Sequence, residues 1–428
     1  MKKTPVGKIE DITIVLEREM KKLTLKEWED KYIVKEVKQF DQKNQMFIRP
    51  LWDAGINRQL DDWSFIGPVK KEKGYTLEDQ ALRWASSRGT MMTLFNTFKP
   101  NVSPAARGLQ GMMAKGAPFS GYQPPEGEKT DVSDPKKVTQ MVKKVATWFG
   151  ADLVGVCKLD RRWLYSHTVE RPEMMGAIDG VVDMESIPQK VPEDFQYVLV
   201  MAFEMDYELM KYVPSYLGNT ATRMGYSRMA ITNNYLTSFI KNLGFDAIDC
   251  SINDVALSVP MAMQAGLGDL ARNGLMVTRK YGVRVRLNNV LTNMPLVPDE
   301  PIDFGVTEFC MSCEICAEKC PSQSIAYGAR TSKPNNISNV GGVLKWPING
   351  ETCRMYWGRR HSPCAICITV CPYNKPDTAF HRFVRWCTDH IRWADPLYVK
   401  ADKWAGYGKT EKADHFWEDW RPQKGTRL

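Results

Sequence analysis

The chain has 428 residues, 43% of them hydrophobic and 25% charged, which is typical of a globular protein of two or three structural units. No hydrophobic run approaches the roughly 20 residues that a membrane-spanning helix needs. The net charge is +8, but the Lys and Arg residues are scattered among acidic ones rather than gathered in a stripe. This disfavours a nucleic-acid partner.

The first 133 residues are expected to form an irregular N-terminal unit that contributes to a pocket. Aromatic residues are dispersed through it, and Gly and Pro punctuate residues 108–128. Phe47 and Trp63 are its candidate pocket residues, although packing in the core explains them equally well. The N-terminus lacks a secretory signal, so a cytoplasmic location is expected if the chain is complete, whereas a removed signal also fits.

Residues 134–300 are expected to form an α/β core. A helix with apolar residues at helical spacing begins near residue 134 and ends at Gly150, and a short strand follows over 152–157. A second strand is predicted over 195–205 and a long helix over about 220–243. The alternating stretch GVRVRLNNVLTN, residues 282–293, predicts another strand.

Residues 301–376 carry eight cysteines in two runs. The first run has the spacing C-x2-C-x2-C-x3-C-P, which is typical of bacterial ferredoxins that hold two four-iron clusters, and its fourth cysteine binds the other cluster. The predicted ligands are therefore Cys310, Cys313, Cys316 and Cys371 for one cluster, and Cys320, Cys353, Cys364 and Cys367 for the other.

Structural zinc is the alternative for these cysteines, but zinc ligands usually come in pairs separated by a dozen or more residues. The remaining thiols, Cys157, Cys250 and Cys387, are expected to be buried and free. Residues 377–428 are rich in aromatic and charged residues and predict a C-terminal helical tail.

Two further segments are more specific than the cysteine spacing: GLGDLARNGLMVTRKYGVRVRL before the cysteine runs and SNVGGVLKWPINGETC between them. With these segments the chain resembles the corrinoid-dependent reductive dehalogenases of organohalide-respiring bacteria over residues 134–376. The resemblance implies an α+β protein with a nitroreductase-like, corrinoid-binding α/β core and a ferredoxin-like domain that holds two 4Fe-4S clusters.

The resemblance also implies how the cofactor, a cobalamin-type corrinoid, is held. It is expected base-off and without a protein histidine on cobalt, because no histidine of the chain has an Asp two residues before it, as the D-x-H-x-x-G motif requires. Family members commonly leave the cytoplasm by twin-arginine export and sit on the outer face of the cytoplasmic membrane. The implied partners are a small membrane-anchor protein and a respiratory electron donor, and a homodimer is also considered.

The family's proton donor is a Tyr on a helix with a Thr one turn earlier, which the resemblance carries to Tyr226 and Thr222. Tyr235 is an equal-looking alternative by sequence alone. A cation beside the phenol would stabilise the phenolate after proton transfer, and Arg286 is favoured over Arg284. Asn253 fills the family's third polar catalytic position.

Exposed backbone amides in two loops suit the amide and phosphate groups of a corrinoid. The loop residues expected to bind the corrinoid are Gly266, Leu267, Gly268, Ser338, Asn339 and Gly341, and the further candidates for an apolar substrate pocket are Trp346 and Trp357.

The expected activity is removal of halide from small organohalides by a Co(I) corrinoid, with chlorinated alkanes or alkenes favoured and bromophenols left open. Two alternatives stand beside it. One is an enzyme similar to epoxyqueuosine reductase, which acts on tRNA, and the other is an iron–sulfur electron carrier without catalytic activity.

Overall fold

A four-stranded antiparallel sheet lies at the centre of the computed structural model, which describes residues 21–58, 67–90, 129–169, 181, 183–250, 255–414 and 416–418. The strand order is β2 (Leu153–Lys158), β5 (Tyr197–Glu204), β9 (Val285–Thr292) and β6 (Ala247–Cys250). Every pairing in this sheet is antiparallel. The core is therefore α+β, although helices and strands alternate along the chain as expected for α/β domains.

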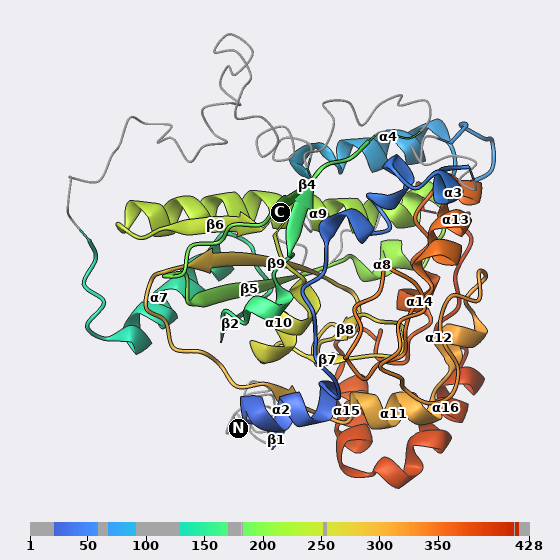
Figure 1. Cartoon of the computed structure of the whole chain (residues 1–428). Coiled ribbons are helices and arrows are strands. Elements are labelled where there is room, and N and C mark those ends of the chain that lie inside the picture. Colours follow the sequence, from blue (N-terminus) through green and yellow to red (C-terminus); the bar gives the residue numbers. More distant parts are fainter. Residues whose placement is uncertain are drawn as a thin grey trace, which may run out of the picture.

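Both faces of the sheet are covered, which explains the unbroken hydrophobic run of β5. Leu199, Met201 and Phe203 face the core formed with α7 (Pro135–Trp148) and α9 (Tyr216–Asn242). The alternate residues Val198, Val200 and Ala202 pack in the core that contains α10 (Ser258–Gln264). Figure 1 shows α9 running along one side of the sheet. The predicted strands at 152–157 and 195–205 and the long helix are thus confirmed.

The N-terminal part is less irregular than expected. It contains the helices α2 (Leu25–Tyr32) and α4 (Leu77–Ala85) and the short turn α3 (Ala54–Asn57). Both longer helices begin with a capping box, in which the N-cap threonine and the acidic residue three positions later bond each other's backbone. The patterns TLKE and TLED are therefore typical of helix starts. The expectation of an irregular unit took only the dispersed aromatic residues and the Gly and Pro content into account.

The eight cysteines of the two runs lie on or next to a cluster of short helices beside the sheet (Figure 1). These helices are α11 (Val306–Ser312), α12 (Ile315–Glu318), α13 (Gly350–Arg360) and α14 (Ile366–Thr369). The tail forms α15 (Ala379–His390) and α16 (Asp395–Trp404). A small hairpin, β7 (Asp269–Leu270) and β8 (Met276–Val277), lies between the sheet and these helices.

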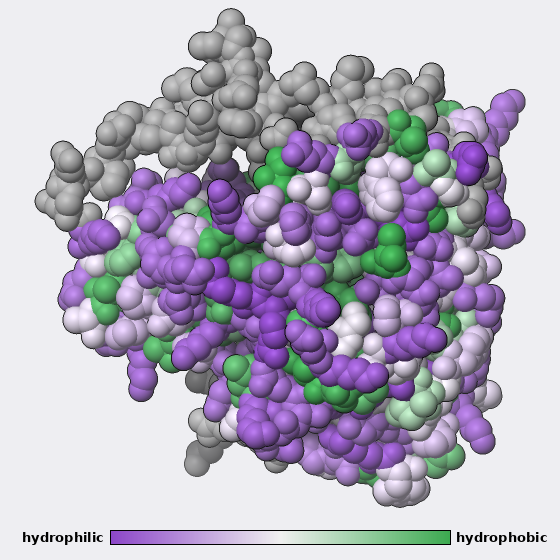
Figure 2. All heavy atoms as spheres, viewed as in Figure 1, coloured by the Kyte–Doolittle hydropathy of each residue, from purple (hydrophilic) through white to green (hydrophobic). Residues whose placement is uncertain are grey.

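The remaining short elements border the main layers. They are α8 (Tyr207–Met210), the pair β3 (His167–Val169) and β4 (Ser186–Pro188), and the pair β1 (Lys21–Lys22) and β10 (Ile302–Asp303). Among the described residues, no helix is both long and hydrophobic enough to cross a bilayer. On the face seen in Figure 2, hydrophilic residues dominate and hydrophobic ones form small patches between them.

Gly155 of β2 allows α10 to approach the sheet, because a Cβ there would collide with the backbone oxygen of Ala265 just after that helix. We predict that Gly155→Ala lowers the free energy of unfolding by about 1–3 kcal/mol, the usual cost of overpacking. Gly341→Ala is the control, since its nearest neighbour would be Pro334 Cδ at 3.7 Å. Equal urea midpoints for both variants would contradict this close approach.

Candidate active site

A cavity of about 580 Å³ lies where the sheet, the N-terminal helices and the loop segment 327–349 meet. Its walls are mainly aromatic and aliphatic, and two cationic side chains, Arg286 and Lys345, reach it. The described lining residues include no Asp or Glu. Residues from the N-terminal segment that line it are Trp28, Tyr32, Phe40, Gln45, Met46 and Phe47. The N-terminal unit therefore contributes to the cavity.

Tyr226 and Arg286 meet at the wall formed by α9 and β9. Arg286 Nη1 lies 3.5 Å from the Tyr226 hydroxyl, and its guanidinium carbon lies 4.8 Å from the centre of the Tyr226 ring. Arg286 Nη2 lies 3.5 Å from Thr222 Oγ1, so one guanidinium bridges two side chains a helical turn apart. Thr222 is buried behind this contact and does not line the cavity.

The two alternatives for these roles lie elsewhere. Arg284 pairs with Glu204 at 2.9 Å and stacks over Tyr207, and burial lowers the pKa of its guanidinium. Tyr235 is 47% exposed and packs against Phe149 on the outer side of α9. Asn253 and Trp63 lie outside the described residues, as does His415.

The expected loop contacts divide into two groups. Ser338 and Asn339 line the cavity, as do the aromatic residues Phe47, Trp346 and Trp357. Gly341 belongs to the same loop but is not among the lining residues, and a Cβ there would lie 3.7 Å from Pro334.

The other predicted loop, Gly266 to Gly268, is directed into the protein and does not line the cavity. Leu267 packs into the core beside α10. A Cβ on Gly266 would point at the carbonyl of Glu300, and one on Gly268 at the carbonyl of Val277. These glycines allow tight backbone packing, and Gly274 and the adjoining β8 residue Met276 line the cavity instead.

Sequence reasoning missed several residues that line this cavity. Trp28 and Trp163 are buried, and their indole nitrogens have no hydrogen-bond partner in the part of the chain that the structure describes. Lys345 contributes an ammonium group to the same lining. Residues of this kind carry no motif, and only the fold brings them together.

The two expected groups of four cysteines remain a prediction, because thiols of both groups affect one another: burial raises the pKa of the Cys316 thiol, and Cys371 and then Cys367 raise it further. Burial raises the pKa of the Cys310 thiol, and Cys371, Cys313 and Cys316 raise it further. Burial likewise raises the pKa of Cys353 to about 11, with repulsion from Cys320, and that of Cys364 to about 12, with repulsion from Cys353 and Cys320. Burial also raises the pKa of the Cys367 thiol. Repulsion from Cys353, Cys364 and Cys320, and to a smaller extent from Cys371, raises it further.

No group of three His, Cys, Asp or Glu side chains within the described ranges is close enough to hold a single metal ion. In a four-iron cluster each of the four thiolates binds a different iron, so such closeness is not required there. A donor set of eight thiols, five of them buried and three partly buried, fits two such clusters.

The loop of the β7–β8 hairpin ties the cavity to both cysteine groups. Arg272 is fully buried and donates from Nη2 to the Cys310 carbonyl at 2.7 Å and from Nε to the Cys313 carbonyl at 3.1 Å. Its neighbour Asn273 donates to the Cys367 carbonyl at 3.1 Å. The Arg272 guanidinium also stacks 4.5 Å from Trp346, a cavity wall.

Fold and site together define a class of protein in which a module with two runs of clustered cysteines adjoins a large, mainly apolar cavity. No protein-family model matches the chain. It is 38% identical over 303 residues to a tetrachloroethene reductive dehalogenase of Sulfurospirillum multivorans, covering 67% of this chain and 60% of that protein. It is also 32% identical over 122 residues to an epoxyqueuosine reductase of Lactococcus garvieae, covering 28% of this chain and 32% of that protein.

The solved structure of a catabolic reductive dehalogenase superposes with a TM-score of 0.68 at 19% identity, covering 95% of this chain and 52% of that one. That likeness shows a shared fold. The chain belongs to the reductive dehalogenase family. It spans 60% of the curated relative's length and about half of the superposed chain.

Arg272 offers a test of how the cavity is tied to the cysteine groups. We predict that Arg272→Met lowers the free energy of unfolding by about 3–5 kcal/mol, because the buried partners of a charged group are left unpaired. Arg161→Met is the matched control, since this partly exposed arginine also donates to two carbonyls, those of Val191 and Pro192. Urea unfolding should show a much smaller loss for the control, and equal losses would rule out a special role for Arg272.

Proposed function

We propose that the chain carries the catalytic site of a reductive dehalogenase, a respiratory terminal reductase that replaces halogen by hydrogen in small organohalides. The reaction consumes two electrons and one proton per carbon–halogen bond and releases halide. The observation that carries the proposal is the Tyr226–Arg286 pair, which lies in a cavity without described acidic residues and beside eight clustered thiols.

The residues fit the cofactors that the family uses. Two groups of four cysteines would hold two 4Fe-4S clusters, and the cavity would hold a corrinoid, base-off and without a histidine ligand on cobalt. A corrinoid supplies a strongly reducing cobalt centre for breaking the carbon–halogen bond.

Within this proposal Tyr226 delivers the proton to the substrate carbon. A phenol is a weak acid, and each unit of pKa corresponds to about 1.4 kcal/mol. The guanidinium of Arg286 stabilises the phenolate that forms, since an adjacent cation favours the charged state. Thr222 holds the second nitrogen of that guanidinium and so fixes its direction. Asn253 remains the third polar candidate.

Substrate recognition would come from shape and apolar contact, because halocarbons offer little to hydrogen-bond. Phe47 and Trp357 line the cavity as a tilted ring pair with centres 5.8 Å apart, and Trp346 lines it too. Trp63 is retained as a candidate. Chlorinated alkanes or alkenes fit these walls best, and the relative from Sulfurospirillum multivorans is named for tetrachloroethene.

The finer organisation follows the family. We assign residues 1–133 to the N-terminal unit, 134–300 to a nitroreductase-like core, 301–376 to a ferredoxin-like domain and 377–428 to the tail. The enzyme would work peripherally on the outer face of the cytoplasmic membrane, after twin-arginine export, with a small anchor protein and a respiratory electron donor. A homodimer is compatible with this arrangement.

Two observations favour this function over its alternatives. The match to the tetrachloroethene enzyme covers 67% of the chain, whereas the match to epoxyqueuosine reductase covers 28%. A simple electron carrier would not need a phenol and a guanidinium facing a large cavity. Cobalt analysis of the reconstituted protein separates the carrier from both enzymes, because a carrier binds iron only.

Removal of the Tyr226 hydroxyl tests the proton donor. We predict that Tyr226→Phe lowers dehalogenation of chlorinated ethenes by about 100-fold to 10,000-fold, the usual range for general acid catalysis. Iron and corrinoid contents should stay unchanged. Tyr235→Phe is the control, because that phenol lies on the outer side of α9, and its activity should be normal. Normal turnover in Tyr226→Phe with full cofactor content would exclude the role.

The crossed cysteine assignment is tested by counting iron. The double variant Cys310→Ala/Cys320→Ala should lose both clusters and nearly all of the expected total of about eight irons, because each cysteine serves a different cluster. If consecutive cysteines shared one cluster, about four irons would remain. Cys387→Ala, a buried thiol outside both groups, is the control and should retain the full iron content.

A further inference from the structure

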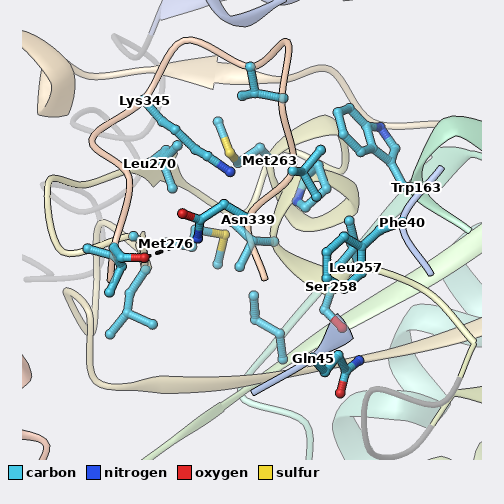
Figure 3. A pocket seen from close by; sticks show the side chains of 18 of the residues that line it. Phe40, Gln45, Trp163, Leu257, Ser258, Met263, Leu270, Met276, Asn339 and Lys345 are labelled. Carbon is cyan, nitrogen blue, oxygen red and sulfur yellow. Dashed lines mark hydrogen bonds between the residues drawn. The ribbon is translucent and has the colours of Figure 1, made fainter. Parts of the chain in front are cut away.

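Lys345 is a cation without a described counter-charge in the cavity. Figure 3 shows its side chain extending inward, toward a region that Asn339 and Met263 also line. Within the ranges described, no hydrogen bond or ion pair reaches its ammonium group; the hydrogen bonds that Lys345 does form, to Thr331, are backbone ones. Burial lowers the pKa of the ammonium to about 8, and no neighbouring charge contributes to that shift. At pH 7 the group is therefore still mostly protonated.

The position of Lys345 is firmly held by its backbone. Lys345 and Thr331 exchange two backbone hydrogen bonds of 2.8 and 3.1 Å, and the preceding Leu344 donates to the Tyr32 carbonyl at 2.7 Å. On the other side, Trp346 donates from its indole to the Gly328 carbonyl at 2.7 Å. The ammonium therefore projects from a fixed, extended segment. This favours a ligand-binding lysine over a surface lysine whose side chain has merely folded inward.

The surroundings of Lys345 favour an anion. The described lining of the cavity has no carboxylate, and the nearby Tyr32 hydroxyl is already engaged by Asp269 and Thr307. A cavity with an uncompensated cation and no described carboxylate is completed by a ligand that carries a negative charge.

We propose that Lys345 binds the phosphodiester of the corrinoid's nucleotide tail and thereby selects complete corrinoids over those that lack the nucleotide. The amide side chains of a corrinoid are neutral and need no cation, so the phosphodiester is the anionic group that an ammonium on the cavity wall matches. Arg286 is already engaged with Tyr226 and Thr222 at a different wall. This inference rests on the proposed function, because it requires a corrinoid in the cavity.

The test measures affinity rather than turnover. Apo protein is titrated with cobalamin and with cobinamide, which lacks the phosphodiester and nucleotide, and binding is followed by quenching of tryptophan fluorescence. Lys345→Met removes the charge and retains most of the length, Lys345→Arg keeps a cation, and Lys333→Met on the exposed part of the same segment is the control. We expect Lys345→Met to weaken cobalamin binding about 10-fold to 100-fold and to leave cobinamide binding unchanged.

The cobalamin affinity of Lys345→Arg should lie between those of the wild type and Lys345→Met. The affinities of Lys333→Met should match those of the wild type. Two results overturn the inference while leaving the proposed function intact: equal affinity of the wild type for both corrinoids, or equal losses for both in Lys345→Met. A change in chloride inhibition with both corrinoid affinities unaltered would also overturn it, because Lys345 would then bind the halide product. If the wild type retains neither corrinoid, the proposed function itself fails and the inference with it.

Discussion

The buried guanidinium of Arg272 is the contact on which the relation between cavity and cysteine groups depends. It joins backbone carbonyls of one cysteine group to the face of Trp346, which lines the cavity, and Asn273 adds a bond to the other group. A fully buried charge is tolerated only where its hydrogen bonds are satisfied, so the hairpin loop and the cysteine loops must form together. The cysteine segments and the cavity are thus held at a fixed separation.

The N-terminal segment completes this arrangement by closing the cavity. Trp28, Tyr32 and Phe47 come from residues that precede the central sheet, yet they line the cavity together with residues of β9 and α10. Aromatic rings in the cavity wall reduce its contact with water and lower the local dielectric constant. The charge of Arg286 then acts on Tyr226 more strongly than it would in water.

Much of the site was predictable where function depends on a local pattern. The spacing of eight cysteines and the four-residue step from Thr222 to Tyr226 are visible in the sequence, and the structure brings these residues together. The wall around Lys345, Trp28 and Trp163 was not predictable, because its members are far apart in sequence and share no motif. The role of Gly266 and Gly268 cannot be read from sequence, because a glycine needed for close packing looks identical to one that admits a ligand.

The geometry at Tyr226 also indicates what a bound ligand must change. Arg286 reaches Tyr226 and Thr222 at 3.5 Å each, at the long limit of hydrogen bonding, and its buried Nε has no partner among the described residues. Catalytic hydrogen bonds commonly shorten only when the ligand is bound. Under the proposed function, a ligand in the cavity would exclude the remaining water and shift the guanidinium toward the phenol, which would couple proton delivery to occupancy of the site.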